Sequence, residues 1–354
     1  MRWRPSPRLI TTLALAAVLP ACTKTATDPL AGVTRTVAPP TDADLAFTSN
    51  GWSTDSTAGR ELFAARLDGS ELTQLTFCNA VQPCDMIEAA FASDHFRAAV
   101  RQRLSADQSP SLLFFDLSRS ASAELVPASG AVSGVDWSPT GDILAYSGAG
   151  TTAGSEDLFR TDVTRPTSDN QQNTANLTCV NVLNAPPCDP TILELRPRLD
   201  APSETAVYER IAPGGKGEVY VFLTTVQQTL VVPGGPGTDT LPGTHDVVGG
   251  NADPDYSPDA TSIVFRRLTS VGNNGLGTWD LLTTKADGTG IQTVVTGNAY
   301  RGAPDWGAQG ILFAEQDPAT NQYSLVVVQP DGSGRHVVLS LPAGFILSYP
   351  RWLK

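Results

Sequence analysis

Histidine is scarce in this chain of 354 residues, which contains only three. His95 lies in SDHFR, His245 in LPGTHDVVGG and His336 beside Arg335, so they occupy separate segments. The serine-hydrolase motif G-x-S-x-G is absent, and PGGPG (233–237), with no nucleophile to serve, is interpreted as a turn-rich loop. A shared metal site or a histidine acid–base pair is therefore not expected. Each histidine is assigned to the surface or to a hydrogen bond, and the chain is predicted not to be an enzyme.

Positive charge is also in short supply. Lys and Arg total 24 against 36 Asp and Glu, which gives a formal net charge of −12. No cluster of basic residues is present, so neither nucleic acid nor direct docking on anionic lipid is expected. The 31 glycines and 27 prolines favour many turns and few long helices. The length fits two ordinary domains or one large all-β domain.

Long apolar runs are missing except near the N-terminus. Arg2, Arg4 and Arg8 precede LITTLALAAVL (9–19), which is too short to span a bilayer as a stable helix. This pattern indicates a signal peptide over 1–21.

The end of that signal, LPAC, resembles a bacterial lipoprotein signal, in which Cys22 would be acylated. The alternative is a plain secretory signal cleaved after Ala21. Thr23, in place of an Asp, favours the outer membrane over the inner membrane. The chain is thus predicted to be lipid-anchored in the cell envelope, facing the periplasm, with 22–40 as a flexible tether.

Cysteine is limited to five residues, and the four beyond Cys22 occur in two similar stretches, LTFCNAVQPCD (75–85) and LTCVNVLNAPPCD (177–189). Export to an oxidising compartment favours two local disulfides, Cys78–Cys84 and Cys179–Cys188, each stabilising by about 2–3 kcal/mol at most. A four-thiolate zinc site is the alternative. The spacings are wider than C-x-x-C and no histidine lies near, which favours the disulfides.

Repeated segments organise most of the chain. VDWSPTGDILAYSG (135–148), PDYSPDATSIVFRR (254–267) and PDWGAQGILFAEQ (304–316) align with one another. Each predicts a strand, a turn and a second strand. Asp-Gly pairs at Asp68, Asp287 and Asp331 predict tight hairpins later in the repeat. The large apolar residues that end each predicted first strand lie 46 to 62 residues apart and are Phe91, Trp137, Leu199, Tyr256, Trp306 and Trp352.

This repeated order of strands, turns and Asp-Gly pairs resembles the repeats of TolB-type β-propellers and is similar to the propeller domains of dipeptidyl-peptidase-like enzymes. The resemblance covers 44–354 and implies an all-β, six-bladed propeller with four-stranded blades over 41–354. The C-terminal segment SYPRWLK would supply a first strand to the blade begun by DADLAFTSN. Pairing of the N- and C-terminal strands would close the ring. The two cysteine loops would then connect neighbouring blades on one face, as structural clips.

The residue before each first-strand aromatic should lie at an equivalent place around the central channel. These residues are Arg351, Ala90, Asp136, Arg198, Asp255 and Asp305. Their carboxylates could hold Ca²⁺ through oxygen ligands or receive a basic peptide. The alternative is that Asp and Arg pair with one another or with backbone. No other cofactor is expected.

The leading functional hypothesis is a non-enzymatic module that binds another envelope protein or a peptide, as a monomer. Trp52, in the loop NGWSTDSTAGRE, is a candidate binding anchor, although packing beneath the loop is an equal alternative. A role like that of TolB is an analogy, because TolB-type proteins carry an α/β domain before the propeller and this chain has a short tether there. The alternatives are a hydrolase or lyase acting on glycan or peptide, and a propeller that senses a cation or ligand.

Overall fold

A computed structural model describes most of the chain between residues 33 and 353. The described ranges are 33–50, 59–78, 85–103, 109–119, 121–126, 132–150, 154–163, 174–179, 191–200, 205–223, 227–241, 245–272 and 276–353. Cys22, Trp52, Cys84 and Cys188 lie outside them, so the predictions made on these four residues stay predictions.

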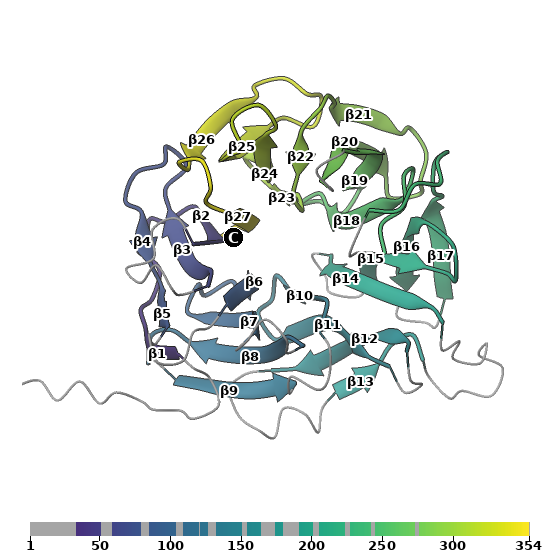
Figure 1. Cartoon of the computed structure of the whole chain (residues 1–354). Helices are drawn as coiled ribbons and strands as arrows, with labels where there is room; N and C mark the ends of the chain where they lie inside the picture. Colours follow the sequence, from purple (N-terminus) through teal and green to yellow (C-terminus); the bar gives the residue numbers. More distant parts are fainter. Residues whose placement is uncertain are drawn as a thin grey trace, which may run out of the picture.

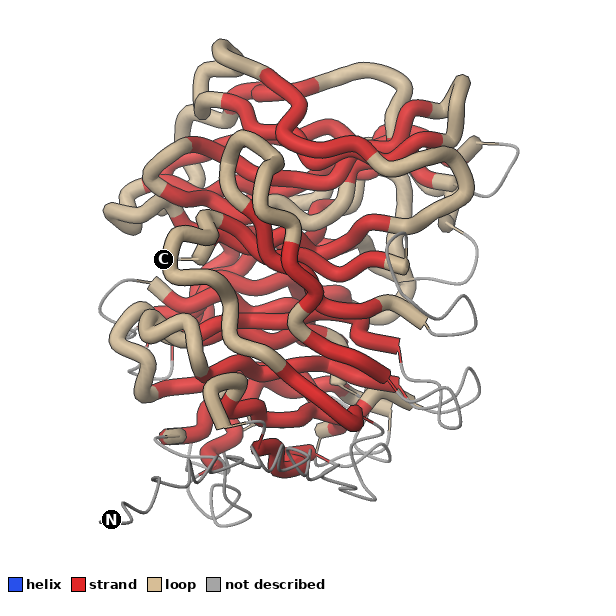
Figure 2. Tube along the Cα trace, turned by 90° about the vertical axis from the view of Figure 1, so that its left-hand side faces the viewer, coloured by secondary structure: helices blue, strands red, loops and turns tan. Residues whose placement is uncertain are grey.

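The described residues form strands and turns without a helix (Figure 2). They accordingly contain no candidate membrane-spanning helix. Turns separate the strands and keep them short, and many of these turns contain Gly, Pro or Asp.

Most sheets follow chain order with antiparallel neighbours. One contains β6 (Asp85–Phe91), β7 (Arg97–Arg103), β8 (Ser111–Asp116) and β9 (Ala121–Val126). Another contains β18 (Asn251–Tyr256), β19 (Ser262–Val271), β20 (Gly277–Lys285) and β21 (Gln292–Val295). A third contains β22 (Tyr300–Arg301), β23 (Asp305–Gly307), β24 (Gly310–Asp317), β25 (Gln322–Val328) and β26 (His336–Ser340), where β22 and β23 both pair with β24.

Two consecutive groups of strands join into one larger sheet. The first group is β10 (Gly134–Trp137), β11 (Ile143–Ala149), β12 (Glu156–Asp162) and β13 (Thr174–Asn176). The second is β14 (Leu193–Leu199), β15 (Thr205–Ile211), β16 (Gly217–Leu223) and β17 (Gln227–Val232). A single parallel bridge between Glu156 and Leu193 connects them, so each group keeps its own four-stranded order.

The last described strand pairs with a strand near the N-terminal end of the described residues. β27 (Leu347–Trp352) pairs antiparallel with β2 (Leu45–Ser49), and β3 (Glu61–Ala65) and β4 (Thr73–Gln74) follow. Leu45 is opposite Trp352, and the Leu353 N–H donates to the Asp44 carbonyl at 2.9 Å. Figure 1 shows the sheets arranged around a common centre, with β27 beside β2.

The apolar core lies between neighbouring sheets. One cluster combines Phe114 of β8 with Trp137 of β10, whose rings meet edge to face at 5.2 Å between centroids. Another combines Leu45 and Phe63 with Leu325 of β25. Comparable clusters occupy the remaining junctions. Each sheet therefore buries both faces against its neighbours, in line with strands rich in Val, Ile, Leu and Phe.

The predicted Asp-Gly hairpins are confirmed. Gly69, Gly288 and Gly332 have φ of +77°, +83° and +84° and lie in the turns β3–β4, β20–β21 and β25–β26. The preceding aspartates each accept a backbone N–H two residues on, at 2.9 Å. Positive φ with a local side-chain acceptor is what Asp-Gly provides at low steric cost.

One part of the predicted tether takes part in a sheet. Within 22–40, β1 (Val33–Thr36) pairs with β5 (Thr76–Cys78), and Val37 and Ala38 pack against the core. This stretch is therefore part of a sheet, and a flexible tether over the rest of 22–40 stays a prediction. The alternating VTRTV pattern suits an added edge strand, which the Thr, Ala, Asp and Pro composition of the whole segment obscures.

Candidate functional site

Bulges with proline shape the first strands. Arg196, Asp253 and Tyr349 each precede a proline and have φ of +54°, +48° and +46°. The pairing register of their strands shifts at the same places. A bulge re-aims side chains, and here it lets residues on both sides of the proline contact side chains of other sheets.

The aligned channel candidates are partly brought together. The Arg351 guanidinium lies 3.2 Å from Asp305 and 4.0 Å from Asp136. It also lies 2.7 Å from Glu88, which in turn is 3.3 Å from Arg198. We call Glu88, Asp136, Arg198, Asp305 and Arg351 the axial network. Its arginines and Glu88 are almost fully buried, so these charges stabilise one another away from water.

The three aligned aspartates also connect successive first strands. Asp136 accepts the N–H of Leu199 at 2.9 Å. Asp255 accepts the N–H of Trp306, and Asp305 that of Trp352, both at 2.7 Å. Charge-assisted bonds of this kind are stronger than neutral ones. The carboxylates thus tie one sheet to the next, while Ala90, at the equivalent place of β6, packs in the core.

This engagement bears on the calcium hypothesis. No group of three or more His, Cys, Asp or Glu suited to a metal occurs in the part of the chain that the structure describes. The aligned aspartates instead face arginines and backbone N–H groups, which is the pairing alternative of the sequence analysis.

A second buried cluster, which the sequence analysis missed, lies beside the axial network. It consists of Arg196, Glu209, Asp246, Asp253 and Arg266, and we call it the acid-rich cluster. Arg196 lies 3.1 Å from Asp253 and 3.9 Å from Asp246 and bonds Glu209, and Arg266 bonds Asp253. The Arg266 guanidinium also lies 3.8 Å from the Trp279 ring centroid. Three carboxylates face two arginines.

Within the acid-rich cluster, the pKa values of two carboxyl groups are shifted in opposite directions. Burial raises the pKa of Glu209 to about 8, with added repulsion from Asp246 and Asp253 that Arg196 only partly offsets. Burial also acts on Asp253, but Arg196 and Arg266 outweigh it and lower the pKa of Asp253 to about 2. Near neutral pH Glu209 therefore holds a proton, which balances the cluster's charge.

A sequence signal for these residues did exist. Glu88, Arg196 and Asp253 lie two positions before the aligned residues Ala90, Arg198 and Asp255. Equivalent positions of aligned repeats occupy equivalent places around the ring, so the alignment could have been extended upstream to these three residues. Glu209 and Asp246 carry no comparable pattern, because they come from a second strand and a loop.

An apolar cavity of about 390 Å³ opens where turns between first and second strands meet the C-terminus. Its walls include Leu199, Tyr256, Pro258, Ala308, Trp352 and Leu353. We call it the axial pocket. Pro258 and Ala308 are exposed at its rim, while Trp352 and Tyr256 are buried. A Cβ added at Gly307 would lie 2.4 Å from the indole of Trp352. The indole can occupy this position only because residue 307 has no side chain.

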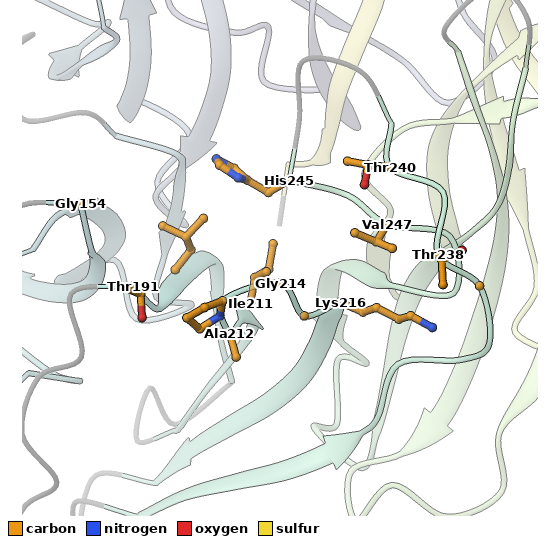
Figure 3. Close-up of a pocket in the computed structure, with 14 residues that line it drawn as sticks. Gly154, Thr191, Ile211, Ala212, Gly214, Lys216, Thr238, Thr240, His245 and Val247 are labelled. Atoms are coloured by element: carbon orange, nitrogen blue, oxygen red, sulfur yellow. The ribbon is translucent and has the colours of Figure 1, made fainter.

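A second cavity, of about 500 Å³, lies on the opposite face and we call it the loop pocket. One wall is the described part of the segment between β17 and β18 (233–241 and 245–250), and the other is the β15–β16 turn. The loop folds back on itself through a bridge between Thr240 and Val247. Figure 3 shows these two residues on one side of the cavity and Ile211 and Thr191 on the other. The Lys216 ammonium bonds the Gly235 carbonyl and so secures the loop's base.

The histidines do not converge. His95 is half-buried in the β6–β7 turn, whereas His245, at the loop pocket, and His336, in β26, are exposed. Their side chains thus belong to three separate parts of the structure. Cys179 is buried and disulfide-bonded. Its pairing with Cys188, and that of Cys78 with Cys84, involve residues outside the described ranges and stay predictions.

Sheets ranged about an axis, each with its first strand innermost, define a β-propeller (Figure 1). Solved structures with this fold include TolB from Acinetobacter baumannii, at 15% identity and TM-score 0.60, with 89% of this chain and 68% of that chain covered. An oligogalacturonate lyase in complex with manganese gives 13% identity and TM-score 0.51, covering 87% and 75%. A nidogen/laminin complex gives 10% and 0.55, covering 88% and 98%. At these identities the likeness concerns the fold, which is that of TolB-type propellers.

No protein-family model matches the chain. No curated protein sequence matches it either.

Proposed function

We propose that the chain is a six-bladed propeller, closed by β27, that acts as a non-enzymatic module for binding a protein or peptide segment. The strand order supports this count when β10–β13 and β14–β17 are taken as separate blades and β22 and β23, which both pair with β24, as one first strand. Apolar clusters at successive junctions, including the one joining β2 and β3 to β24 and β25, support a ring in which neighbouring blades pack face to face all the way round.

The axial pocket is the observation that carries the binding function. Its volume of about 390 Å³ falls within the about 300–1,000 Å³ of typical ligand sites. Aromatic and aliphatic walls formed by Trp352, Tyr256 and Leu199 suit an apolar side chain used as an anchor. Because the pocket opens at the ring axis, the turns of several blades can contact the segment that carries this anchor.

The charged groups of the described residues support binding over catalysis. The axial network pairs its arginines with carboxylates, and the three histidines lie apart. A general acid–base mechanism needs two titratable groups within reach of one substrate. Glu209 has a raised pKa but lies buried against Arg196, away from either cavity's walls.

The proposed binding is tested with a photoreactive amino acid placed at Gln309, which lines the axial pocket and is exposed. Irradiation of intact cells should give a covalent adduct with a second protein. Ala319, exposed in the β24–β25 turn on the opposite face, is the control position. The variant Ala308→Trp should fill the pocket rim and remove the Gln309 adduct, whereas Ala319→Trp should not. Adducts that are equal at both positions would count against the proposal.

We also propose export and lipid anchoring through Cys22, on the sequence pattern alone. The expected consequence is that Cys22→Ala releases the protein into the soluble periplasmic fraction while the propeller stays folded. Membrane fractionation after a salt wash, with circular dichroism of the released protein, measures both. A variant that stays with the membranes would show that the anchor lies elsewhere.

A further inference from the structure

Exposed aspartates lie on the same face of the propeller as the axial pocket. In an antiparallel blade successive turns alternate between the two faces, so the turns between strands one and two share the pocket's face with those between strands three and four. Exposed aspartates occur in many of them, namely Asp68, Asp142, Asp259, Asp287 and Asp331, while the exposed Asp94 is paired with Arg97. Asp142 and Asp259 lie close in sequence to Pro139 and Pro258, which line the pocket.

Several of these carboxylates are held in the ionised form. The Ser257 hydroxyl and the Thr261 N–H donate to Asp259 and lower its pKa. The equivalent turn bonds lower the pKa of Asp287 and Asp331. This charge persists across physiological pH, because ionised carboxylates with lowered pKa values gain no proton there.

Arginines on the same face are engaged with carboxylates, and the exposed Lys285 lies near enough to Asp287 to help lower the pKa of that carboxyl. Arg97 lies 2.6 Å from Asp94 and Arg119 lies 3.4 Å from Asp116. Arg66 pairs with Asp42 and, at 3.2 Å, with Glu71. No Lys or Arg is among the residues that line the axial pocket in the described structure, whereas Asp255 is. The exposed charged side chains that follow the lining residues Pro139 and Pro258 most closely in sequence, Asp142 and Asp259, are therefore acidic.

We infer that the axial pocket binds a peptide segment of a partner protein in which an apolar anchor residue is flanked by Lys or Arg. The inference rests on the proposed binding function and specifies the chemistry of the partner. The anchor would lie against Trp352, Tyr256 and Leu199, while the flanking cations face Asp142 and Asp259. Charge complementarity of this kind selects partners and speeds association. A second copy of this chain is disfavoured because two acidic faces repel.

Selection from a library tests this without assuming a partner. A random twelve-residue peptide library displayed on phage is panned on the protein and depleted on the Ala308→Trp variant, with Ala319→Trp as a matched control. Enriched peptides should combine a Phe, Trp, Leu or Ile with neighbouring Lys or Arg. Enrichment of acidic or uncharged peptides would overturn the charge inference and leave the binding function standing. Failure to enrich any peptide that Ala308→Trp removes would contradict both.

Variants with altered charge test the inference quantitatively, through their affinity for an enriched peptide. Asp142 is exposed, and Asp259→Asn keeps the oxygen that accepts the Thr261 N–H. The double variant Asp142→Lys, Asp259→Asn should weaken an enriched synthetic peptide about tenfold at low salt, with the difference shrinking as salt screens the charges. Asp239→Lys, exposed in the loop 233–250 on the other face, is the control. Equal weakening by both variants, or none, would overturn the inference, as would a dimer that Ala308→Trp dissociates.

Discussion

Gly134 shows how closely the blades approach near the axis. A Cβ at this position would come within 2.6 Å of the Arg196 Cα and 3.0 Å of its N. Both atoms are backbone, so neither can rotate away. The absence of a side chain at Gly134 is what allows β10 to lie against the bulge that carries Arg196.

We therefore expect Gly134→Ala to lower the free energy of unfolding by about 1–3 kcal/mol, as for other overpacked sites. Gly302→Ala is the matched control, because its nearest contact would be 3.4 Å, from the Ala314 Cβ. Its cost should stay below about 1 kcal/mol. Urea unfolding of both variants measures the difference. Equal urea midpoints of the two variants would show that the backbone around Gly134 shifts to accommodate the added Cβ.

Glu209 gives the protein a defined pH dependence. Its pKa is about 8 in the folded state against an ordinary 4.5, so between these values the folded chain holds a proton that the unfolded chain releases. The stability contributed by this proton is full below about pH 4.5 and is lost as pH rises through 8. Glu209→Gln should flatten this decline in urea midpoints between pH 5 and 8. An unchanged slope would assign the proton to another group.

Asp253 affects the free energy of unfolding at acidic pH, and its contribution changes with pH in the opposite direction. Its pKa falls to about 2 from an ordinary 3.8, so its contribution is present above 3.8 and is lost as pH falls through 2. The stabilising contributions of these two groups are therefore both present between about pH 3.8 and 4.5. Both effects originate in one cluster, in which burial acts on every member and the arginines favour one carboxylate over the other.

At the scale of elements, the described first strands of neighbouring sheets do not pair through their backbones. The aligned aspartates connect them instead, by accepting backbone N–H groups of the next first strand. Asp255 is buried and accepts the Trp306 N–H from the next blade. Asp255→Ala leaves that N–H without this acceptor, and the free energy of unfolding should fall by about 1–3 kcal/mol. Asp255→Asn retains an acceptor oxygen and should cost less. If the two variants are equally destabilised, the carboxylate's charge and not its hydrogen bond is what matters.

The strand pattern was predictable because it depends on local chemistry. Ser-Pro turns, Asp-Gly hairpins and β-branched runs each specify a short stretch of backbone, and their repeat predicts the sheets. In the structure the Ser138 and Ser257 hydroxyls accept N–H groups five residues on, at 3.1 and 3.0 Å, as equivalent turns should. The wall formed by the loop 233–250 was not predictable. Its shape depends on contacts with Lys216 and on the packing of Leu241 against Trp279, which no periodicity signals.

The acid-rich cluster illustrates the same limit for the site. Aligning repeats brings equivalent positions of first strands together, which is why Arg351, Asp305 and Asp136 were found as a group. The bulges at Arg196 and Asp253 add a residue that simple alternation does not include. Glu209 and Asp246, which come from a second strand and a loop, have no spacing of their own in the sequence that links them to these bulges.

At the scale of the whole molecule, β27 joins the two ends of the ordered chain. Removing 347–354 would take Trp352 from the cluster that holds Leu45 and Phe47 and would leave Asp305 and Glu88 without Arg351. Unpaired buried charges and an open edge on β2 both disfavour the folded state. We expect the truncated protein to aggregate or to unfold without a cooperative transition, as followed by light scattering and circular dichroism.

A circular permutant separates closure from chain order. Residue 353 is joined to residue 41 through a short Gly-Ser linker, and new ends are opened at the exposed Pro318–Ala319 turn. Because Leu353 already bonds Asp44, the linker spans a small gap and the permutant keeps all contacts of β27. Its urea midpoint should lie close to that of the unpermuted chain 41–353, while the same permutant lacking 347–353 should lose its transition. A permutant that fails to fold although β27 is present would show that the ring depends on its ends being free.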